Sequence, residues 1–156
     1  MKFPALNLPV ADFTLRKQNG KIYVFDVLRK KYVYLTPEEW VRQSFLHYLL
    51  FHLQYPQGLI ALETPIKLND NKMRSDIVVF DKQGKPALLV ECKAAQIEIC
   101  QQTFDQIIVY NMKLNAPYLI VTNGLEHFCF RQPSLGQKIE FFNNIPAYEL
   151  ISGTLG

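Results

Sequence analysis

The stretch Leu88-Leu89-Val90-Glu91-Cys92-Lys93 is an apolar run that ends in a carboxylate and an amine two residues apart. Side chains in a β-strand alternate between its two faces, so Glu91 and Lys93 are expected to point the same way while Cys92 points to the opposite face. An apolar strand that ends in such a charged pair is a candidate for a functional site.

A second apolar run, Arg74-Ser75-Asp76-Ile77-Val78-Val79-Phe80-Asp81, is joined to the first by Lys82-Gln83-Gly84-Lys85-Pro86, which is typical of a turn. If the two strands pair around a four-residue loop, or around a two-residue Gln83-Gly84 turn, Asp76 lies directly opposite Glu91. A three-residue loop would instead shift the register by one and put the two carboxylates on opposite faces of the hairpin.

Two opposed residues on neighbouring strands lie about 5 Å apart, and two like charges there are destabilising unless a cation lies between them. The pair Asp76 and Glu91 suits a hard divalent ion such as Mg²⁺ or Mn²⁺, which prefers oxygen ligands. The ammonium of Lys93 can orient or help deprotonate a water and offset charge on a pentavalent phosphate. The residues thus predict metal-dependent phosphodiester hydrolysis; the alternative is an ordinary hairpin with charged ends.

Three motifs, taken in order, resemble known nucleases. Asp76 followed by Glu91-Cys92-Lys93 looks like the bipartite motif of the PD-(D/E)xK nuclease superfamily, with Ser75 at the position of the motif's proline. The stretch Thr36-Pro37-Glu38-Glu39-Trp40-Val41-Arg42-Gln43 resembles the opening helix of the N-terminal domain of type I restriction enzyme R subunits. Gln106-Ile107-Ile108-Val109-Tyr110 is similar to the Gln-x-x-x-Tyr element of type I restriction and RecB-like nucleases.

The resemblance, which extends over about residues 36–131, implies an Mg²⁺-dependent endonuclease-like domain. In that mechanism Asp76 and Glu91 bind the metal, and Lys93 handles the attacking water or stabilises the transition state. The resemblance further implies that the backbone carbonyl of Cys92 can be a metal ligand, and that an acidic residue of the first helix lies near the metal.

We assign that acidic role to Glu38, because residues 38, 41, 45 and 49 share one face of the predicted helix. The alternative is that Glu38 and Glu39 merely complement the helix dipole. Gln106 and Tyr110 are four residues apart and therefore neighbours on a helix. The resemblance implies that they position the nucleic acid strand; otherwise they form a half-exposed helix flank.

The chain of 156 residues is 49% hydrophobic and 20% charged, which fits one domain with a real core. It has no apolar run of the roughly 18 residues that a membrane span needs, and Met1-Lys2-Phe3-Pro4 does not begin a signal peptide. The three cysteines and three histidines lack metal-ligand spacing, so zinc is not expected. The net charge of +3 permits nucleic acid as a partner without demanding it. We expect a cytoplasmic protein that does not enter the membrane.

The expected fold class is α/β, with a restriction-endonuclease-like core of helix, three strands, helix and strand around a mixed central sheet. Thr36, Pro37 and Glu39 form a capping box at the start of the first helix. In the second helix, Phe104, Ile107, Ile108 and Met112 are expected to face the sheet. The strand that follows this crossover helix is expected to be parallel to its partner. The expected helices and strands are 37 to about 54, 59–68, 74–81, 88–93, 101–114, 118–122, 127–131 and 138–142, with a polar turn at 69–73.

Residues 1–35 are expected to form a lead-in and a hairpin packed on the nuclease domain of residues 36–156. The hairpin strands, Asp12 to Lys17 and Ile22 to Leu28, flank Asn19-Gly20, a strong hairpin signal. Its basic cluster is either a phosphate-contacting arm or a solvated edge protected by charge. The cluster comprises Arg16, Lys17, Lys21, Arg29, Lys30 and Lys31.

The expected partner is DNA. No Gly-x-x-x-x-Gly-Lys-Ser/Thr loop is present, so the sequence shows no ATP motor of the kind that type I R subunits carry. The chain is expected to act alone, as a homo-oligomer, or with separate motor or specificity subunits. The rival hypothesis is a nuclease-fold nucleic-acid-binding module without turnover, indifferent to Mg²⁺ and to Lys93.

Overall fold

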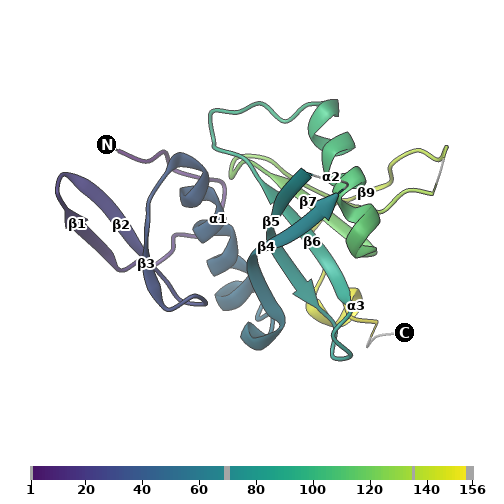
Figure 1. The fold of residues 1–156 in the computed structure, drawn as a ribbon, viewed down its shortest axis with the longest axis horizontal. Coiled ribbons are helices and arrows are strands. Elements are labelled where there is room, and N and C mark those ends of the chain that lie inside the picture. The colour runs from purple at the N-terminus through teal and green to yellow at the C-terminus, as the bar shows by residue number, and fades with distance from the viewer. Residues whose placement is uncertain (1, 69–70, 135, 154–156) are drawn as a thin grey trace.

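The computed structural model describes residues 2–68, 71–134 and 136–153. Figure 1 shows a small N-terminal sheet and a larger central sheet, with helix α1 (Pro37–His47) between them and helix α2 (Gln101–Leu114) against the larger sheet. This arrangement confirms the predicted mixed α/β fold.

The central sheet has the strand order β4-β5-β6-β7-β8-β9, and its strands are antiparallel except for β6 and β7. The predicted parallel pairing of the Tyr118 strand is therefore confirmed. The strands are β4 (Ile60–Leu68), β5 (Asn71–Phe80), β6 (Pro86–Cys92), β7 (Tyr118–Thr122), β8 (His127–Arg131) and β9 (Phe141–Phe142).

The turn between β5 and β6 differs from both loops that would give the predicted register. The backbone N–H of Asp81 donates to the carbonyl of Lys85 at 2.8 Å, which closes a three-residue loop. A β-bulge then shifts the pairing, because Val79 pairs with Leu88 while Phe80 pairs with Pro86. The bulge compensates for the loop, so the register predicted for the end of the hairpin holds.

Helix α1 begins where the sequence predicts. Thr36 is the N-cap, and its hydroxyl accepts the backbone N–H of Glu39 at 3.0 Å. The second half of the predicted capping box is wrong, because the Glu39 carboxylate binds arginines instead. The helix ends at His47 and continues as one π-helical turn, Tyr48–His52, so the helical segment stops short of residue 54.

Helix α2 buries Phe104 and Ile107 against the sheet as predicted. The prediction that Met112 also faces the sheet is wrong, since Met112 is 61% exposed. Asn111 is buried instead. Its side-chain amide donates to the carbonyl of Ala116 at 2.7 Å and its amide oxygen accepts the N–H of Ala116 at 2.9 Å. The helix therefore turns a polar residue inward to hold the chain that leads into β7.

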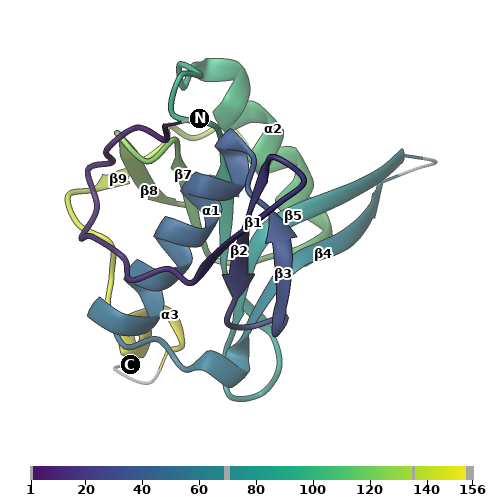
Figure 2. The ribbon, with the colours of Figure 1, turned by 90° about the vertical axis from the view of Figure 1, so that its left-hand side faces the viewer.

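The N-terminal sheet has three strands rather than the predicted two: β1 (Leu15–Gln18), β2 (Lys21–Asp26) and β3 (Lys31–Tyr34). Its first turn lies at Asn19 and Gly20, both with positive φ, as predicted. The lead-in runs along α1, where the carbonyl of Pro4 accepts the indole N–H of Trp40 at 2.9 Å. Figure 2 shows this segment passing beside α1 and then crossing in front of the helix to reach β1.

Several shorter elements complete the fold. A 3₁₀ turn (Gln57–Leu59) precedes β4, and a short helix α3 (Tyr148–Ile151) lies near the end of the described chain. β9 is shorter than the strand predicted for 138–142. Strand β5 begins at Asn71 and so extends into the predicted polar turn at 69–73, of which residues 69–70 lie outside the described residues. No helix in the described ranges is long and apolar enough to cross a membrane.

Candidate active site

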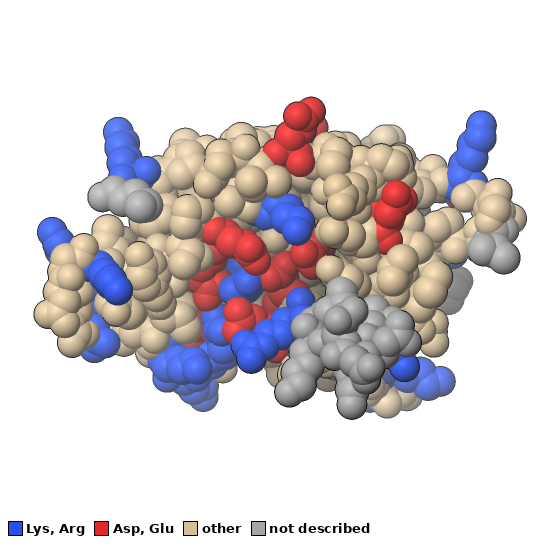
Figure 3. Space-filling model, turned by 45° about the horizontal axis from the view of Figure 1, so that its top comes forward, with Lys and Arg blue, Asp and Glu red and all other residues tan. Residues whose placement is uncertain are grey.

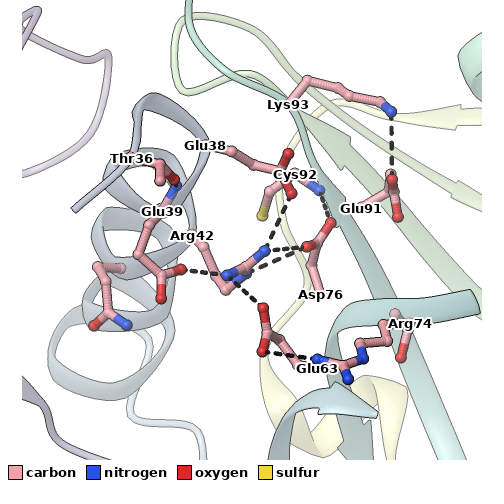
Figure 4. A network of polar contacts seen from close by, with 12 residues as sticks. Thr36, Glu38, Glu39, Arg42, Glu63, Arg74, Asp76, Glu91, Cys92 and Lys93 are labelled. Carbon is pink, nitrogen blue, oxygen red and sulfur yellow. Dashed lines mark hydrogen bonds and ion pairs between the residues drawn. The ribbon is translucent and has the colours of Figure 1, made fainter. Parts of the chain in front are cut away.

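Four predicted site residues meet where the first turn of α1 approaches the middle of β5 and the end of β6 (Figure 4); they are Glu38, Asp76, Glu91 and Lys93. The ladder of pairs between these strands ends at Ile77 and Val90. Beyond it, the side chain of Asp76 takes the place of a backbone acceptor: its Oδ2 accepts the N–H of Cys92 at 2.7 Å. Asp76 is thus fixed at the point where the two strands diverge.

The other oxygen of Asp76 is held by Arg42 of α1. Nη2 of Arg42 lies 2.7 Å and Nε 3.2 Å from Oδ1 of Asp76. Both side chains are more than nine-tenths buried. Burial disfavours the charged guanidinium, but the carboxylates of Asp76 and Glu39 raise the pKa of Arg42 above its ordinary value. No role was predicted for Arg42 from the sequence.

Glu91 lies beside Asp76, and its carboxyl group is harder to ionise than a carboxyl group in water. Burial and, next, the Asp76 carboxylate raise the pKa of Glu91 to about 8. The ammonium of Lys93 lies 3.5 Å from Oε1 of Glu91 and acts in the opposite direction. Glu91 and Lys93 therefore share one side of the chain at the end of β6, as predicted.

Glu38 reaches the same place from α1. Burial and then the Asp76 carboxylate raise the pKa of Glu38, while Arg42, 3.1 Å away, and Lys93 oppose this shift. Figure 4 shows Glu38 extending from the helix toward the strand ends, whereas Glu39 turns to the other side of Arg42. The structure therefore brings Glu38, and not Glu39, to the carboxylates of the strands.

Arg42 is the centre of a larger ionic network. Besides Asp76 and Glu38, its guanidinium binds Glu39 and, at 3.2 Å, Glu63 of β4. Glu63 therefore lies at the same network as the carboxylates of α1 and β5. The spacing of Glu38 and Arg42, one helical turn apart, was the available sequence signal, because an acid–base pair at that spacing lies on one helix face.

Arg29 extends this network to the N-terminal sheet. Its guanidinium binds Asp26 at 2.8 Å, Glu39 at 2.7 Å and Glu63 at 3.1 Å. Because carboxylates bind its guanidinium, Arg29 is not part of a phosphate-contacting arm. The assignment of Arg29 to the basic cluster from the sequence is therefore wrong. Burial alone would raise the pKa of Asp26, but hydrogen bonds from Arg29 and Gln43 hold it below its ordinary value.

Gln106 and Tyr110 lie one turn apart on α2, and both are half-buried. Burial and then the carboxylate of Glu91 raise the pKa of Tyr110, and Lys93 opposes the shift. The charges of Glu91 and Lys93 therefore act on the phenol of Tyr110. The positioning role of Gln106 and Tyr110 stays a prediction.

Three carboxylates, those of Glu38, Asp76 and Glu91, converge at this site, and carboxylate oxygens are the donors that a hard divalent cation prefers. The pKa values of Glu38 and Glu91 are raised, and a cation bound beside them would lower both. As the side chains stand in the described ranges, no group of three or more His, Cys, Asp and Glu residues could hold a metal ion. Figure 3 shows acidic and basic side chains intermingled in one central patch of this face.

Comparison with known proteins gives one family. The family described as "Type I restriction enzyme R protein N terminus" matches residues 37–146. No curated protein matches the chain. Among solved structures, a candidate nuclease belonging to DUF820 from Anabaena variabilis ATCC 29413 shares 16% identity at a TM-score of 0.48, with 94% of this chain and 88% of that chain covered.

The family match spans α1, the strand pair that carries Asp76 and Glu91, and α2 with Gln106 and Tyr110. It therefore includes every residue predicted for the candidate site, while Arg29 of the ionic network lies outside it, and it supports a nuclease-like function. On this match the chain belongs to the family of type I restriction enzyme R protein N-terminal domains.

Proposed function

We propose that this protein is a metal-dependent nuclease that hydrolyses phosphodiester bonds, with DNA as its substrate and with internal cleavage as its mode. The observation that carries this proposal is the meeting of Glu38, Asp76 and Glu91 beside Lys93, within the segment that the restriction-enzyme family matches.

The ligands of the proposed ion are Asp76 and Glu91, with Glu38 and the backbone carbonyl of Cys92 as further donors. Mg²⁺ or Mn²⁺ bound there supplies a Lewis acid and lowers the pKa of a bound water. Oδ1 of Asp76 accepts two N–H groups of Arg42, and Oδ2 accepts the N–H of Cys92, so both oxygens of this proposed ligand are held in place.

The remaining groups act on water and on the substrate. Lys93 keeps an ammonium beside Glu91, where it can hold the attacking water or offset charge that grows on the phosphate. Gln106 and Tyr110 are proposed to hold the scissile strand by hydrogen bonds to its backbone. Arg42 orients Asp76 and does not itself touch the substrate.

One observation favours a second candidate function, a nucleic-acid-binding module without turnover. Arg42 already supplies a buried positive charge to Asp76, Glu39 and Glu63. A site whose carboxylates are neutralised by an arginine can be stable without a metal ion. Such a module would bind nucleic acid equally well in chelator and in Mg²⁺.

The experiment is a cleavage assay on linear, supercoiled and single-stranded DNA with Mg²⁺, Mn²⁺ or chelator. Asp76→Ala and Lys93→Ala are compared with Lys82→Ala, a control in the exposed β5–β6 turn. We expect cutting that needs metal, falls at least about 100-fold in both site variants, and is unchanged in the control.

Cutting that persists in Asp76→Ala would assign the activity to another site or to a contaminant. An inactive wild type that binds DNA equally with and without Mg²⁺ would replace the nuclease by the binding module. An inactive wild type whose DNA binding needs Mg²⁺ would be tested again with separately supplied motor and specificity subunits, as the family match suggests. Failure there also would overturn the nuclease proposal.

A further inference from the structure

The outer face of the N-terminal sheet carries four aromatic rings. Tyr23 of β2 pairs with Tyr34 of β3, and Phe25 pairs with Tyr32, so the four side chains point to the same side. The ring centroids lie 5.8 Å apart in the first pair and 5.4 Å apart in the second. We call these four residues the aromatic platform.

The aromatic platform is not part of the protein core. The opposite face of β2 carries Val24, which is fully buried, and Asp26, which accepts a hydrogen bond from Gln43 of α1 at 2.8 Å. The sheet therefore packs on the helix through that face. The platform rings are half-buried against one another, and Tyr34 is 46% exposed. The other face of the sheet thus presents aromatic rings to solvent.

Two cations lie over the rings of this same face. The guanidinium of Arg16 lies 4.1 Å from the ring centroid of Tyr32, and the ammonium of Lys21 lies 5.4 Å from that of Tyr34. Arg16 pairs with Tyr23 across β1 and β2, which puts it on the platform side. The platform therefore combines flat aromatic surfaces with positive charges that cover them.

The whole sheet is positive on its exposed surface. Asp26 is the one acidic residue between residues 15 and 34, and it is buried and paired with Arg29. Figure 3 shows Lys and Arg side chains and no acidic side chain at the left end of the molecule, where Figure 1 places this sheet. The exposed basic residues are Arg16, Lys17, Lys21, Lys30 and Lys31.

A hollow of about 140 Å³ lies beside Tyr34 at the edge of the sheet, and Lys21 lines it. Lys17 also lines the hollow, but it pairs with Ile22 and therefore lies on the opposite face of the sheet from the platform. The ammonium of Lys21 next to the exposed ring of Tyr34 can hold a phosphate while a base stacks on the ring.

We propose that the aromatic platform binds single-stranded nucleic acid. Bases stack on aromatic side chains whatever their sequence, and basic side chains contact the phosphates that link them. A duplex keeps its base faces stacked inside, so only a single strand can use both features. This inference deepens the proposed nuclease function, because the bound strand would be a segment of the substrate next to the cut.

The chain connects the aromatic platform directly to the candidate active site. Tyr34 ends β3, Thr36 caps α1, and Glu38 lies in the first turn of that helix. At its other end, the turn after β2 is bound to the site network by Arg29. Figure 2 shows the three strands alongside α1. A nucleic acid strand that leaves the platform at Tyr34 would therefore reach the first turn of α1, which carries Glu38.

The test is fluorescence anisotropy of a labelled oligothymidine of about 12 nucleotides, a length within the site sizes of single-strand binders. Chelator is present throughout, so no cutting occurs. Arg16→Gln, Lys21→Gln and Tyr34→Val are compared with Arg131→Gln. Arg131 is a matched control because its guanidinium lies 5.1 Å from the ring centroid of Tyr118 in the other sheet.

We expect Arg16→Gln and Tyr34→Val each to weaken binding about tenfold, and Arg131→Gln to change it less than about twofold. Arg16→Gln should also lower the slope of log affinity against log salt by about 0.7. A duplex of the same length should bind more weakly than the single strand. An oligouridine arm distinguishes RNA from DNA, since the two differ in the 2′-hydroxyl.

Equal effects of Arg16→Gln and Arg131→Gln, or duplex binding as tight as single-strand binding, would overturn the inference. Tyr34→Val removes a cross-strand ring pair and can weaken the sheet. Lys21→Gln leaves all four rings in place and keeps the test valid. Failure here leaves metal-dependent cutting untouched, and platform-dependent binding without cutting would instead count against the nuclease.

Discussion

Nη2 of Arg42 lies 2.7 Å from Oδ1 of Asp76, and neither side chain is more than 9% exposed. A buried carboxylate without a partner would be strongly destabilising. Arg42 joins Asp76 of the strand pair to Glu39 of its own helix and to Glu63 of β4. The packing of α1 on the sheet at this end thus depends on one guanidinium.

Replacing Arg42 should therefore destabilise the fold severely. Arg42→Met leaves Asp76 and Glu39 buried with fewer partners, and we expect a loss of about 3–5 kcal/mol in the free energy of unfolding. Arg74→Met is the control, because Arg74 is 72% exposed and 3.8 Å from Glu63, so its loss should cost less than about 1 kcal/mol. Urea denaturation measures both. Equal losses would show that the buried network does not stabilise the fold.

The raised pKa of Glu91 predicts a pH-dependent stability. Between its unfolded value of 4.5 and about 8, the folded protein keeps a proton on Glu91 that the unfolded chain releases. Stability should therefore fall as the pH rises through this window, by at most about 1.4 kcal/mol per pH unit from this group.

Glu91→Gln isolates this effect, since a glutamine cannot ionise. The variant should be more stable than the wild type at pH 8, and the difference should shrink toward pH 5. Thermal denaturation in chelator across this range measures the difference. A difference that is constant with pH would show that Glu91 titrates normally in the folded protein.

Tyr110 should matter for cutting and little for folding. Its phenol is close enough to Glu91 and Lys93 for their charges to shift its pKa. Tyr110→Phe removes only the hydroxyl, so we expect cleavage to fall about tenfold or more, with unfolding changed by less than about 1 kcal/mol. Tyr148→Phe, whose hydroxyl donates to the carbonyl of Phe80 at 3.0 Å, removes a hydroxyl elsewhere and should leave cleavage unchanged. Equal rates in both variants would exclude the Tyr110 role.

Local sequence patterns predicted most of the core. Alternating apolar runs located the central strands, and the Thr36 cap located α1, because both signals arise from neighbouring residues. The register of β5 and β6 was predicted for a different reason than the one observed. A bulge at Val79 and Phe80 offsets the three-residue loop. The pattern of apolar residues does not indicate where such a bulge occurs.

The acidic residues of the site could be predicted from the sequence, but the roles of its two arginines could not. Asp76, Glu91 and Lys93 follow from strand pairing, which is a local property of a hairpin. Arg42 and Arg29 acquire their roles only when α1 and the turn after β2 pack on the sheet. Arg29 lies in a run of basic residues and could not be distinguished from its exposed neighbours. The third strand pairs with β2 across a short turn, and Asn111 bonds Ala116 five residues further on. Both contacts are local, but the pattern of apolar residues does not indicate them.

If Glu38, Asp76 and Glu91 form a divalent-cation site, calorimetric titration of the protein with Mn²⁺ detects it without any substrate. We expect one binding site in the wild type that is weakened at least about tenfold in Glu91→Gln and in Asp76→Asn. Asp105→Asn, an exposed change on α2, should bind as the wild type does. Absence of binding to the wild type, or unchanged binding to Glu91→Gln and Asp76→Asn, would show that these carboxylates are not a cation site.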